Sequence, residues 1–309
     1  MKRYLLNLFL LLTVFLTQAA DQYFITVAPD SSGDFTSIQA AINSAKSFPP
    51  QQIEIFIKDG IYYEKIKIPA WNTNITLRGE SKENTIITFD DYFDKIDLGR
   101  NSTFYTYTLM VDANDCVIEN LSIKNTSGPI GQAVALHVEA DRCIFKNINI
   151  IGHQDALYAA GENCRQYYTN CYIEGTTDFI FGAATALFEN CTIMSKSNSY
   201  VTAASTNQGE EFGFVFYQCR FEADSNATNV YLGRPWRKHA KTVIIECYLG
   251  PHINPEGWKI WSNAEKPETT YYAEYKNYGQ GAINDNRAKW TKQLSKKEYK
   301  RYNKSSILW

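Results

Sequence analysis

The sequence predicts an all-β fold, a solenoid of short stacked strands with a helix covering its first end. One observation is a set of cysteines that recur at nearly equal intervals, with one shorter step between Cys171 and Cys191: Cys116, Cys143, Cys171, Cys191, Cys219 and Cys247. Each follows a polar residue and precedes β-forming residues, as in Asn190-Cys191-Thr192-Ile193. A short strand that recurs at this period suits one turn of a β-helix. The chain also lacks long amphipathic helical patterns between these strands, which disfavours a globular α/β fold.

The repeat also predicts how the solenoid is built. Its strands would stack about 4.8 Å apart, with about five or six coils between Cys116 and Cys247. Three asparagines that tolerate the left-handed turn conformation lie in the repeated phrases: Asn120, Asn147 and Asn170. We favour core packing over disulfide bonds for the cysteines, because stacked strands would bury them in inward-facing ladders and an odd count of seven leaves at least one unpaired. Cys164 and Cys171 lie close enough in sequence to form a disulfide bond, and theirs is the one bridge to check in the structure.

Both ends of a solenoid need a cover. The segment from Gly33 to Ile42 has helical apolar spacing after a Ser/Thr cap, so it is predicted to form an N-terminal capping helix. A helical stretch containing Lys292 to Tyr302 is predicted to cover the other end.

Residues 1–20 have the pattern of a secretory signal peptide. A charged start precedes a short apolar run from Tyr4 to Leu16, and small residues follow at Ala19 and Ala20. The run is shorter than the roughly 20 apolar residues that span a bilayer, which disfavours an uncleaved membrane anchor. Residues 21–309 contain no linker or low-complexity tract and are predicted to form a single domain. The mature protein would be secreted or periplasmic, with no membrane association after cleavage.

Composition argues against several classes of partner and cofactor. The net charge of -2 gives no general attraction to nucleic acid. The four histidines are scattered without the spacing of a metal site, and no thiol pair has a zinc-like spacing. No Gly-x-Ser-x-Gly motif is present, which disfavours serine-hydrolase chemistry. The sequence therefore predicts no metal and no other cofactor.

Three polar residues recur at one constant interval: Gln132, Asp155 and Asp178. If this interval is the length of a coil, they would stack on one face of three successive turns. Two carboxylates so close would repel when both are ionised, so one should hold its proton more tightly. Arg234 follows Asp178 by twice the usual cysteine interval, or two coils, where it would pair with Asp178 and keep it ionised. A row of aspartates that only caps strand ends is the alternative.

Four sequence blocks contain these residues, in this order: Gly131-Gln132-Ala133-Val134-Ala135-Leu136, Gln154-Asp155-Ala156-Leu157-Tyr158, Asp178-Phe179-Ile180-Phe181-Gly182 and Leu232-Gly233-Arg234-Pro235-Trp236. Together they resemble the signature blocks of pectin methylesterases, and the resemblance covers nearly all of the mature chain. It implies a right-handed parallel β-helix. It also implies roles: Asp178 as nucleophile, Asp155 as general acid and base, Gln132 and Gln154 as oxyanion donors, Arg234 as the partner that orients Asp178, and Tyr158, Phe181 and Trp236 as aromatic residues lining the sugar cleft.

The implied reaction is hydrolysis of methyl esters on galacturonate units of pectin, giving methanol and demethylated pectin. The implied partner is methyl-esterified homogalacturonan, bound by a monomer that needs no cofactor. Two positions depart from the commoner pattern. Ala204 stands where plant members often have glutamine, which looks more like the microbial branch, and Ala156 stands beside Asp155 where threonine is commoner.

Three other functions remain open at this point. The same residues would serve an esterase or thioesterase acting on another acyl substrate. A pectin-cleaving hydrolase or lyase could use the same solenoid, although the blocks around the two aspartates argue against both. A non-catalytic carbohydrate-binding solenoid would keep the aromatic residues but would have no need for the aspartates and Arg234 together.

Overall fold

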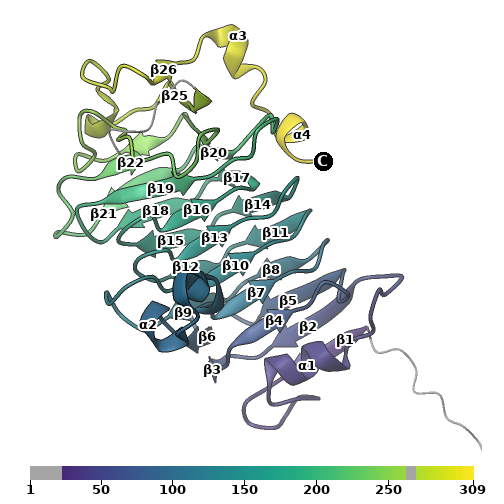
Figure 1. Cartoon of the computed structure of the whole chain (residues 1–309). Helices are drawn as coiled ribbons and strands as arrows, with labels where there is room; N and C mark the ends of the chain where they lie inside the picture. The colour runs from purple at the N-terminus through teal and green to yellow at the C-terminus, as the bar shows by residue number, and fades with distance from the viewer. Residues whose placement is uncertain (1–22, 262–268) are drawn as a thin grey trace, which may run out of the picture.

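The computed structural model describes residues 23–261 and 269–309, which wind into a right-handed parallel β-helix (Figure 1). The prediction of an all-β solenoid is confirmed. The signal peptide predicted for residues 1–20 lies outside the described residues. No helix within the described ranges is long and apolar enough to cross a membrane.

Each strand pairs in parallel with strands of the neighbouring coils, which gives three sheets along the solenoid. Sheet A contains β1 (Phe24–Val27), β2 (Ile53–Ile57), β5 (Ile75–Gly79), β8 (Val117–Glu119), β11 (Cys143–Lys146), β14 (Arg165–Thr169), β17 (Thr185–Glu189), β20 (Phe214–Tyr217), β23 (Lys241–Ile245), β25 (Tyr271–Tyr275) and β26 (Lys292–Gln293). Sheet B contains β3 (Gly60–Tyr63), β6 (Thr85–Phe89), β9 (Ser122–Asn125), β12 (Asn149–Ile151), β15 (Tyr172–Gly175), β18 (Thr192–Ser195), β21 (Arg220–Ala223) and β24 (Tyr248–Leu249). Sheet C contains β4 (Ile66–Ile68), β7 (Leu109–Val111), β10 (Leu136–Val138), β13 (Leu157–Ala159), β16 (Ile180–Gly182), β19 (Tyr200–Ala204) and β22 (Tyr231–Gly233).

The core runs along the axis of the helix as ladders of inward-facing side chains. The clearest of these ladders is a row of aromatic rings on sheet A. Phe145 stacks on Tyr168, Tyr168 on Phe188 and Phe188 on Phe216, with ring centroids 4.6, 4.7 and 4.6 Å apart. These separations match the strand spacing of about 4.8 Å, so parallel in-register pairing sets the stacking distance.

The corner from sheet A to sheet B is made by residues in the left-handed conformation. Asn120, Asn147, Asn170 and Asn190 have φ values of 56°, 51°, 55° and 54°. Asparagine adopts this conformation more readily than most residues, because its short polar side chain bonds locally. The turn role predicted for the first three is confirmed.

The repeated cysteines do not share one position on the coil, which corrects the single repeat inferred from the sequence. Cys171 and the three that follow it in the series come directly after the corner and precede strands of sheet B. Cys116 instead directly precedes β8 and Cys143 is the first residue of β11, both in sheet A. The step from Cys143 to Cys171 is therefore not one coil, because Cys143 pairs with Gln166.

Core packing of the six repeated cysteines is confirmed, since all six are buried. All seven cysteines of the chain lie in the described residues and all are free, so Cys164 and Cys171 do not form a bridge. The solenoid is held together by packing and by its ladders of backbone hydrogen bonds.

The predicted N-terminal capping helix is present as α1 (Ile38–Ser44). The Ser37 side chain accepts a hydrogen bond from the Ala40 backbone N–H at 3.2 Å, which satisfies one of the free donors of the first turn. The helix covers the open end of the core with Ile38, Ala41 and Ile42, all fully buried.

The C-terminal prediction is right only in part. Lys292 and Gln293 form β26, which extends sheet A, and the helix α3 covers only Lys296–Tyr299. Ser295 and Glu298 form a capping box that begins this helix. A second short helix, α4 (Lys304–Ile307), follows and packs against β17.

Candidate active site

The two predicted carboxylates lie in neighbouring coils, each just before a strand of sheet C. Asp155 precedes β13 and Asp178 precedes β16, and the pairing of Leu157 with Ile180 places the two aspartates in register. Gln132 lies one coil earlier, but it pairs with Gln154 and not with Asp155. The constant interval is therefore one coil for the two aspartates and slightly more than one coil for Gln132. All four residues still line the same cavity.

Both aspartates have left-handed backbones, with φ of 64° at Asp155 and 49° at Asp178. The ladder maintains this conformation, because the Asp155 N–H donates to the Thr177 carbonyl at 3.1 Å and the Asp178 N–H donates to the Tyr200 carbonyl at 2.8 Å. Aspartate is one of the few residues that adopt it at low cost. Non-glycine residues with this geometry cluster at functional sites.

Arg234 forms the predicted ion pair with Asp178. Its Nε donates to Oδ1 at 3.0 Å and its Nη2 donates to Oδ2 at 2.6 Å, a bidentate arrangement. The spacing argument behind the prediction was wrong, however. Ile180 pairs with Thr202 and Thr202 pairs with Gly233, so the first of these coils is much shorter than the second and neither has the usual cysteine interval. Arg234 therefore lies further along its coil than Asp178 does, and its long side chain reaches back to the carboxylate.

Two aromatic rings fix the guanidinium of Arg234 from other directions. It lies over Tyr200 at 4.0 Å and over Trp261 at 3.8 Å from the ring centroids. Such stacking restricts the side chain and adds cation–π attraction. Trp261 was missed at the sequence level, although the pairing of Gly233 with Trp258 places it one coil beyond the Arg234 block.

The surroundings of the two carboxyl groups act differently on their pKa values. Burial, with the nearby Asp178 as a second cause, raises the pKa of Asp155 well above its usual value. Burial also raises the pKa of Asp178, but the ion pair and hydrogen bonds with Arg234 oppose that rise. These causes favour the protonated form at Asp155 and the ionised form at Asp178.

An aromatic wall flanks the carboxylates along the outside of sheet C. Tyr158 stacks on Phe181 with ring centroids 4.6 Å apart, and Phe181 contacts Trp236 at 5.9 Å. Phe181 and Trp236 line the cavity that contains the aspartates, whereas Tyr158 lines an adjoining hollow. Phe104, which sequence reasoning missed, packs on Tyr158 at 5.1 Å and lines both spaces.

The cavity has a volume of about 530 Å³, within the usual range for a ligand site. One edge comes from the long segment between β6 and β7, which carries α2 (Phe93–Ile96) and the 3-10 helix η1 (Gly99–Tyr105). The lining residues are Phe93, Arg100, Asn101, Thr103, Phe104, Gln132, Gln154, Asp155, Asp178, Phe181, Ala203, Arg234, Trp236, Arg237 and Trp261. Besides Arg234, whose charge is balanced by Asp178, the lining includes Arg100 and Arg237, which suit an anionic polymer.

Gln132 and Gln154 present side-chain amides to this cavity, and within the described residues those amides make no hydrogen bond. They are free to donate to a ligand oxygen. No group of three or more potential metal-ligating side chains lies close together anywhere in residues 23–261 or 269–309.

Comparison with known sequences gives consistent results. The model of the pectinesterase family matches residues 24–308. "Pectinesterase 31" of Arabidopsis thaliana is 36% identical over 278 residues, which cover 87% of this chain and 87% of that protein. A pectinesterase of Petunia integrifolia is 38% identical and covers 86% of this chain and 73% of its own.

Solved structures agree with the sequence comparison. A pectin methylesterase from carrot superposes with a TM-score of 0.86 at 32% identity, covering 92% of each chain. The enzyme PemA from Erwinia chrysanthemi gives 0.81 at 28% identity, covering 92% of this chain and 96% of its own. A pectin methylesterase determined in complex with a hexasaccharide gives 0.81 at 30% identity, with the same coverage. Plant proteins are prominent among these relatives, so membership of a microbial branch is not confirmed.

Proposed function

Because the chain belongs to the pectinesterase family and is a carboxylic ester hydrolase acting on pectin, we propose that Asp178 is its nucleophile and Asp155 its general acid and base. The observation that carries the proposal is the bidentate Arg234–Asp178 ion pair, formed one coil away from a buried Asp155 in register with it. Family membership argues against the glycosidase, lyase and purely carbohydrate-binding alternatives.

In the first half of the reaction, a carboxylate oxygen of Asp178 attacks the carbonyl carbon of the methyl ester. The amides of Gln132 and Gln154 donate to the carbonyl oxygen as it becomes negative. The bond to the methoxy group then breaks, and Asp155 gives its proton to the departing methanol. The product is an anhydride between Asp178 and the galacturonate.

In the second half, a water molecule attacks the anhydride and gives a proton to the now ionised Asp155. Cleavage of the bond to Asp178 releases the galacturonic acid unit, which then ionises in water, and restores both aspartates to their starting states. One water molecule and one ester become one methanol and one carboxylic acid in each cycle. No step requires a metal ion or another cofactor.

Arg234 is proposed to keep Asp178 ionised and to hold both of its oxygens in place. Stacking on Tyr200 and Trp261 supports this positioning role, because it limits the movement of the guanidinium. We further propose that Phe181 and Trp236 contact the sugar rings in the cleft, with Tyr158 supporting Phe181 from the adjoining hollow. The solved complex of a related enzyme with a hexasaccharide is consistent with an extended groove.

The test is methanol release from highly methylated pectin, measured with a chelator present and alongside an assay for chain shortening. We expect Asp178→Asn to lower kcat by at least about 10³-fold, as loss of a catalytic nucleophile does in other hydrolases. Asp97→Asn is the matched control, since Asp97 has a similar left-handed backbone but is exposed. Near-normal methanol release by the Asp178 variant would exclude this residue as the nucleophile. Persistent thioester turnover with no methanol release would redirect the proposal to another acyl substrate.

We also propose that the protein is exported, with cleavage near Ala19 or Ala20, and that it acts as a monomer. The pattern of residues 1–20 supports export. N-terminal sequencing of protein recovered outside the cytoplasm tests the cleavage, and light scattering of the same sample tests the oligomeric state. A preparation that retains Met1, or one with the mass of a dimer, would contradict the respective proposal.

A further inference from the structure

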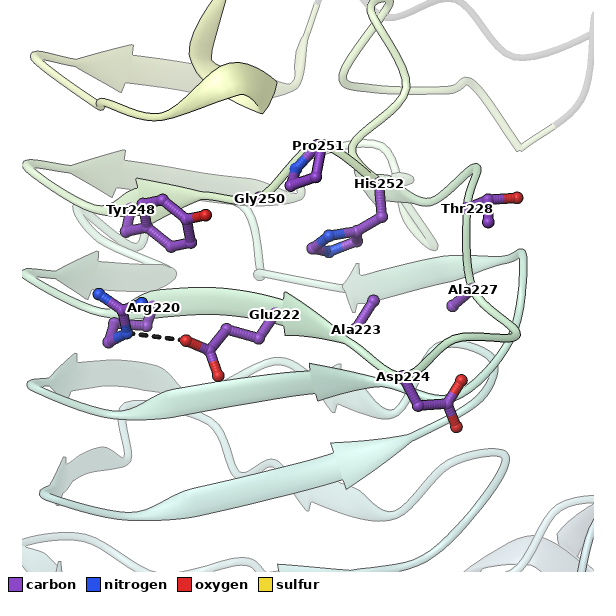
Figure 2. A pocket seen from close by; sticks show the side chains of 10 residues that line it. All are labelled: Arg220, Glu222, Ala223, Asp224, Ala227, Thr228, Tyr248, Gly250, Pro251 and His252. Atoms are coloured by element: carbon purple, nitrogen blue, oxygen red, sulfur yellow. Dashed lines mark hydrogen bonds and ion pairs between the residues drawn. The ribbon is translucent and has the colours of Figure 1, made fainter.

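A second cavity lies on sheet B, and it shares no lining residue with the catalytic cleft. It has a volume of about 450 Å³ and is formed by β21, β24 and the loops that follow them (Figure 2). The lining residues are Arg220, Glu222, Ala223, Asp224, Ala227, Thr228, Tyr248, Gly250, Pro251 and His252. Its size is within the range of sites that bind small organic ligands.

The side chain of His252 lines this cavity and has an unused hydrogen-bonding atom. His252 is only 7% exposed, and its Nε2 has no hydrogen-bond partner among the described residues. Figure 2 shows the imidazole ring projecting between Gly250, which follows β24, and β21, which carries Ala223. An unpaired buried polar atom costs free energy, so a ligand that paired with it would recover that cost.

The charges around the ring determine what kind of ligand fits. Burial lowers the pKa of His252, opposed by Glu222, so the imidazole is neutral near pH 7 and can donate one hydrogen bond and accept another. Arg220 Nε donates to Glu222 Oε1 at 2.8 Å, which balances one carboxylate within the site. In the part of the chain that the structure describes, Asp224 Oδ1 accepts only from the Asn226 backbone at 2.8 Å, so no cation there balances its charge.

The cavity therefore carries one more negative charge than positive charge, together with hydrogen-bonding groups of both kinds. Such a site repels a free carboxylate, including the galacturonate that the enzyme produces. Its hydrogen-bonding groups of both kinds suit a ligand with several hydroxyl groups, with Ala223, Ala227 and Pro251 supplying apolar contact. The unbalanced Asp224 carboxylate and the neutral imidazole are both able to accept from hydroxyl groups.

We propose that this cavity is a second carbohydrate-binding site, which takes an uncharged sugar residue. That residue is either a neutral sugar or a galacturonate unit that is still esterified. The site would attach the enzyme to polymer at a point away from the cleft and so raise the local concentration of substrate. The inference rests on the chemistry of the cavity and does not depend on which aspartate is the nucleophile.

Binding of small probes to the full-length mature protein tests the proposal. The probes are methyl galactoside, methyl arabinoside, the methyl ester of methyl galacturonoside, and sodium galacturonate as the anionic comparison. Asp178→Asn protein is used so that the ester probe is not consumed. Ligand-observed NMR and calorimetry would give the dissociation constants, and comparison of the neutral sugars with the ester distinguishes the two sources.

We expect at least one uncharged probe to bind, and His252→Leu to weaken that binding by about tenfold through loss of a hydrogen bond. His252→Gln, which keeps a polar group there, should retain most of the affinity. Thr228→Trp places a large side chain at the exposed rim and should block the site without altering buried atoms. This second variant keeps the test decisive if His252→Leu fails to fold.

Activity provides a second measurement. With Asp178 intact, Thr228→Trp should raise KM for long pectin while leaving kcat and the turnover of a short esterified oligomer unchanged. Trp236→Ala, in the catalytic cleft, should not affect binding of the neutral probes. The proposal is overturned if no uncharged probe binds, if the blocked variants bind as well as the parent, or if sodium galacturonate binds this site equally well.

Discussion

At the scale of single residues, two aspartates with nearly the same local setting have different proposed tasks. Asp155 and Asp178 share a left-handed backbone, burial and a position before a strand of sheet C. They differ in their charged neighbours, because the Arg234 guanidinium bonds to Asp178 alone. Burial raises the pKa of both carboxyl groups, and the hydrogen bonds from Arg234 favour the ionised form of Asp178 alone.

Replacing Asp155 with Asn should stabilise the fold in a pH-dependent way. The folded pKa of Asp155 is raised above the usual value of 3.8 by burial and by Asp178. Its contribution to stability is therefore complete below pH 3.8 and is lost as the pH rises through the folded pKa. Asparagine cannot ionise, so the Tm advantage of Asp155→Asn over the parent should grow over this range.

Thermal unfolding at a series of pH values checks this expectation, with Asp97→Asn as a control that should show no such trend. A Tm difference that is constant across pH would mean that Asp155 is not preferentially protonated in the folded protein. Activity of Asp155→Asn should be severely reduced at every pH, because the amide cannot act as an acid.

The proposed oxyanion donors give a prediction about the transition state. We expect Gln154→Leu to lower kcat by about 10²- to 10³-fold with little change in KM, because the amide donates mainly to charge that develops during the reaction. Steady-state methanol release on one pectin sample would measure both constants. Gln218→Leu, a change at an exposed glutamine, is the control. A rise in KM with unchanged kcat would instead assign Gln154 to ground-state binding.

At the scale of elements, the in-register strands of sheet A make each coil depend on its neighbours. Phe188 is fully buried and stacks between Tyr168 and Phe216, so its ring contributes to contacts with two other coils. Loss of an interior ring removes these contacts and leaves a cavity.

Phe188→Ala should therefore lower the free energy of unfolding by about 3–5 kcal/mol. Phe188→Leu fills more of the space and should lose less. Urea denaturation followed by circular dichroism would measure both, and kcat of the folded fraction should remain near normal because Phe188 does not line the cleft. Equal losses for the two variants would show that the stacking geometry matters more than the filled volume.

At the scale of the whole molecule, a protein predicted to enter an oxidising compartment has seven free cysteines. Six of them are buried, and Cys164 is half-buried. Burial raises the pKa of the Cys164 thiol to about 11, which disfavours the reactive thiolate. The fold is therefore expected to keep its thiols reduced without a bridge.

We predict that a reductant leaves Tm unchanged and that a thiol reagent titrates seven thiols in denaturant without prior reduction. Under native conditions Cys164 should react before the others, and Cys164→Ser should abolish that first reaction. A lower thiol count in the unreduced, denatured protein, short by one pair, would instead indicate one disulfide.

The sequence by itself determined the class of fold, the capping helix and the family whose signature blocks contain the proposed reactive groups. Strand periodicity, a Ser-capped apolar helix and four ordered blocks are local features, and local features can be read along a chain. The pairing of Asp178 with Arg234 was also predicted correctly, although the coil lengths used to predict it were wrong.

Only the tertiary structure decided how the coils align. Coil length varies because the loops between strands differ in length. Residues at equal spacing in the sequence therefore do not always occupy equivalent positions on successive coils. For this reason Gln132 pairs with Gln154, the cysteines divide between the starts of sheet A strands and of sheet B strands, and Trp261 stacks on Arg234. The cavity around His252 likewise exists only where loops from two coils meet, a juxtaposition that no local pattern in the sequence encodes.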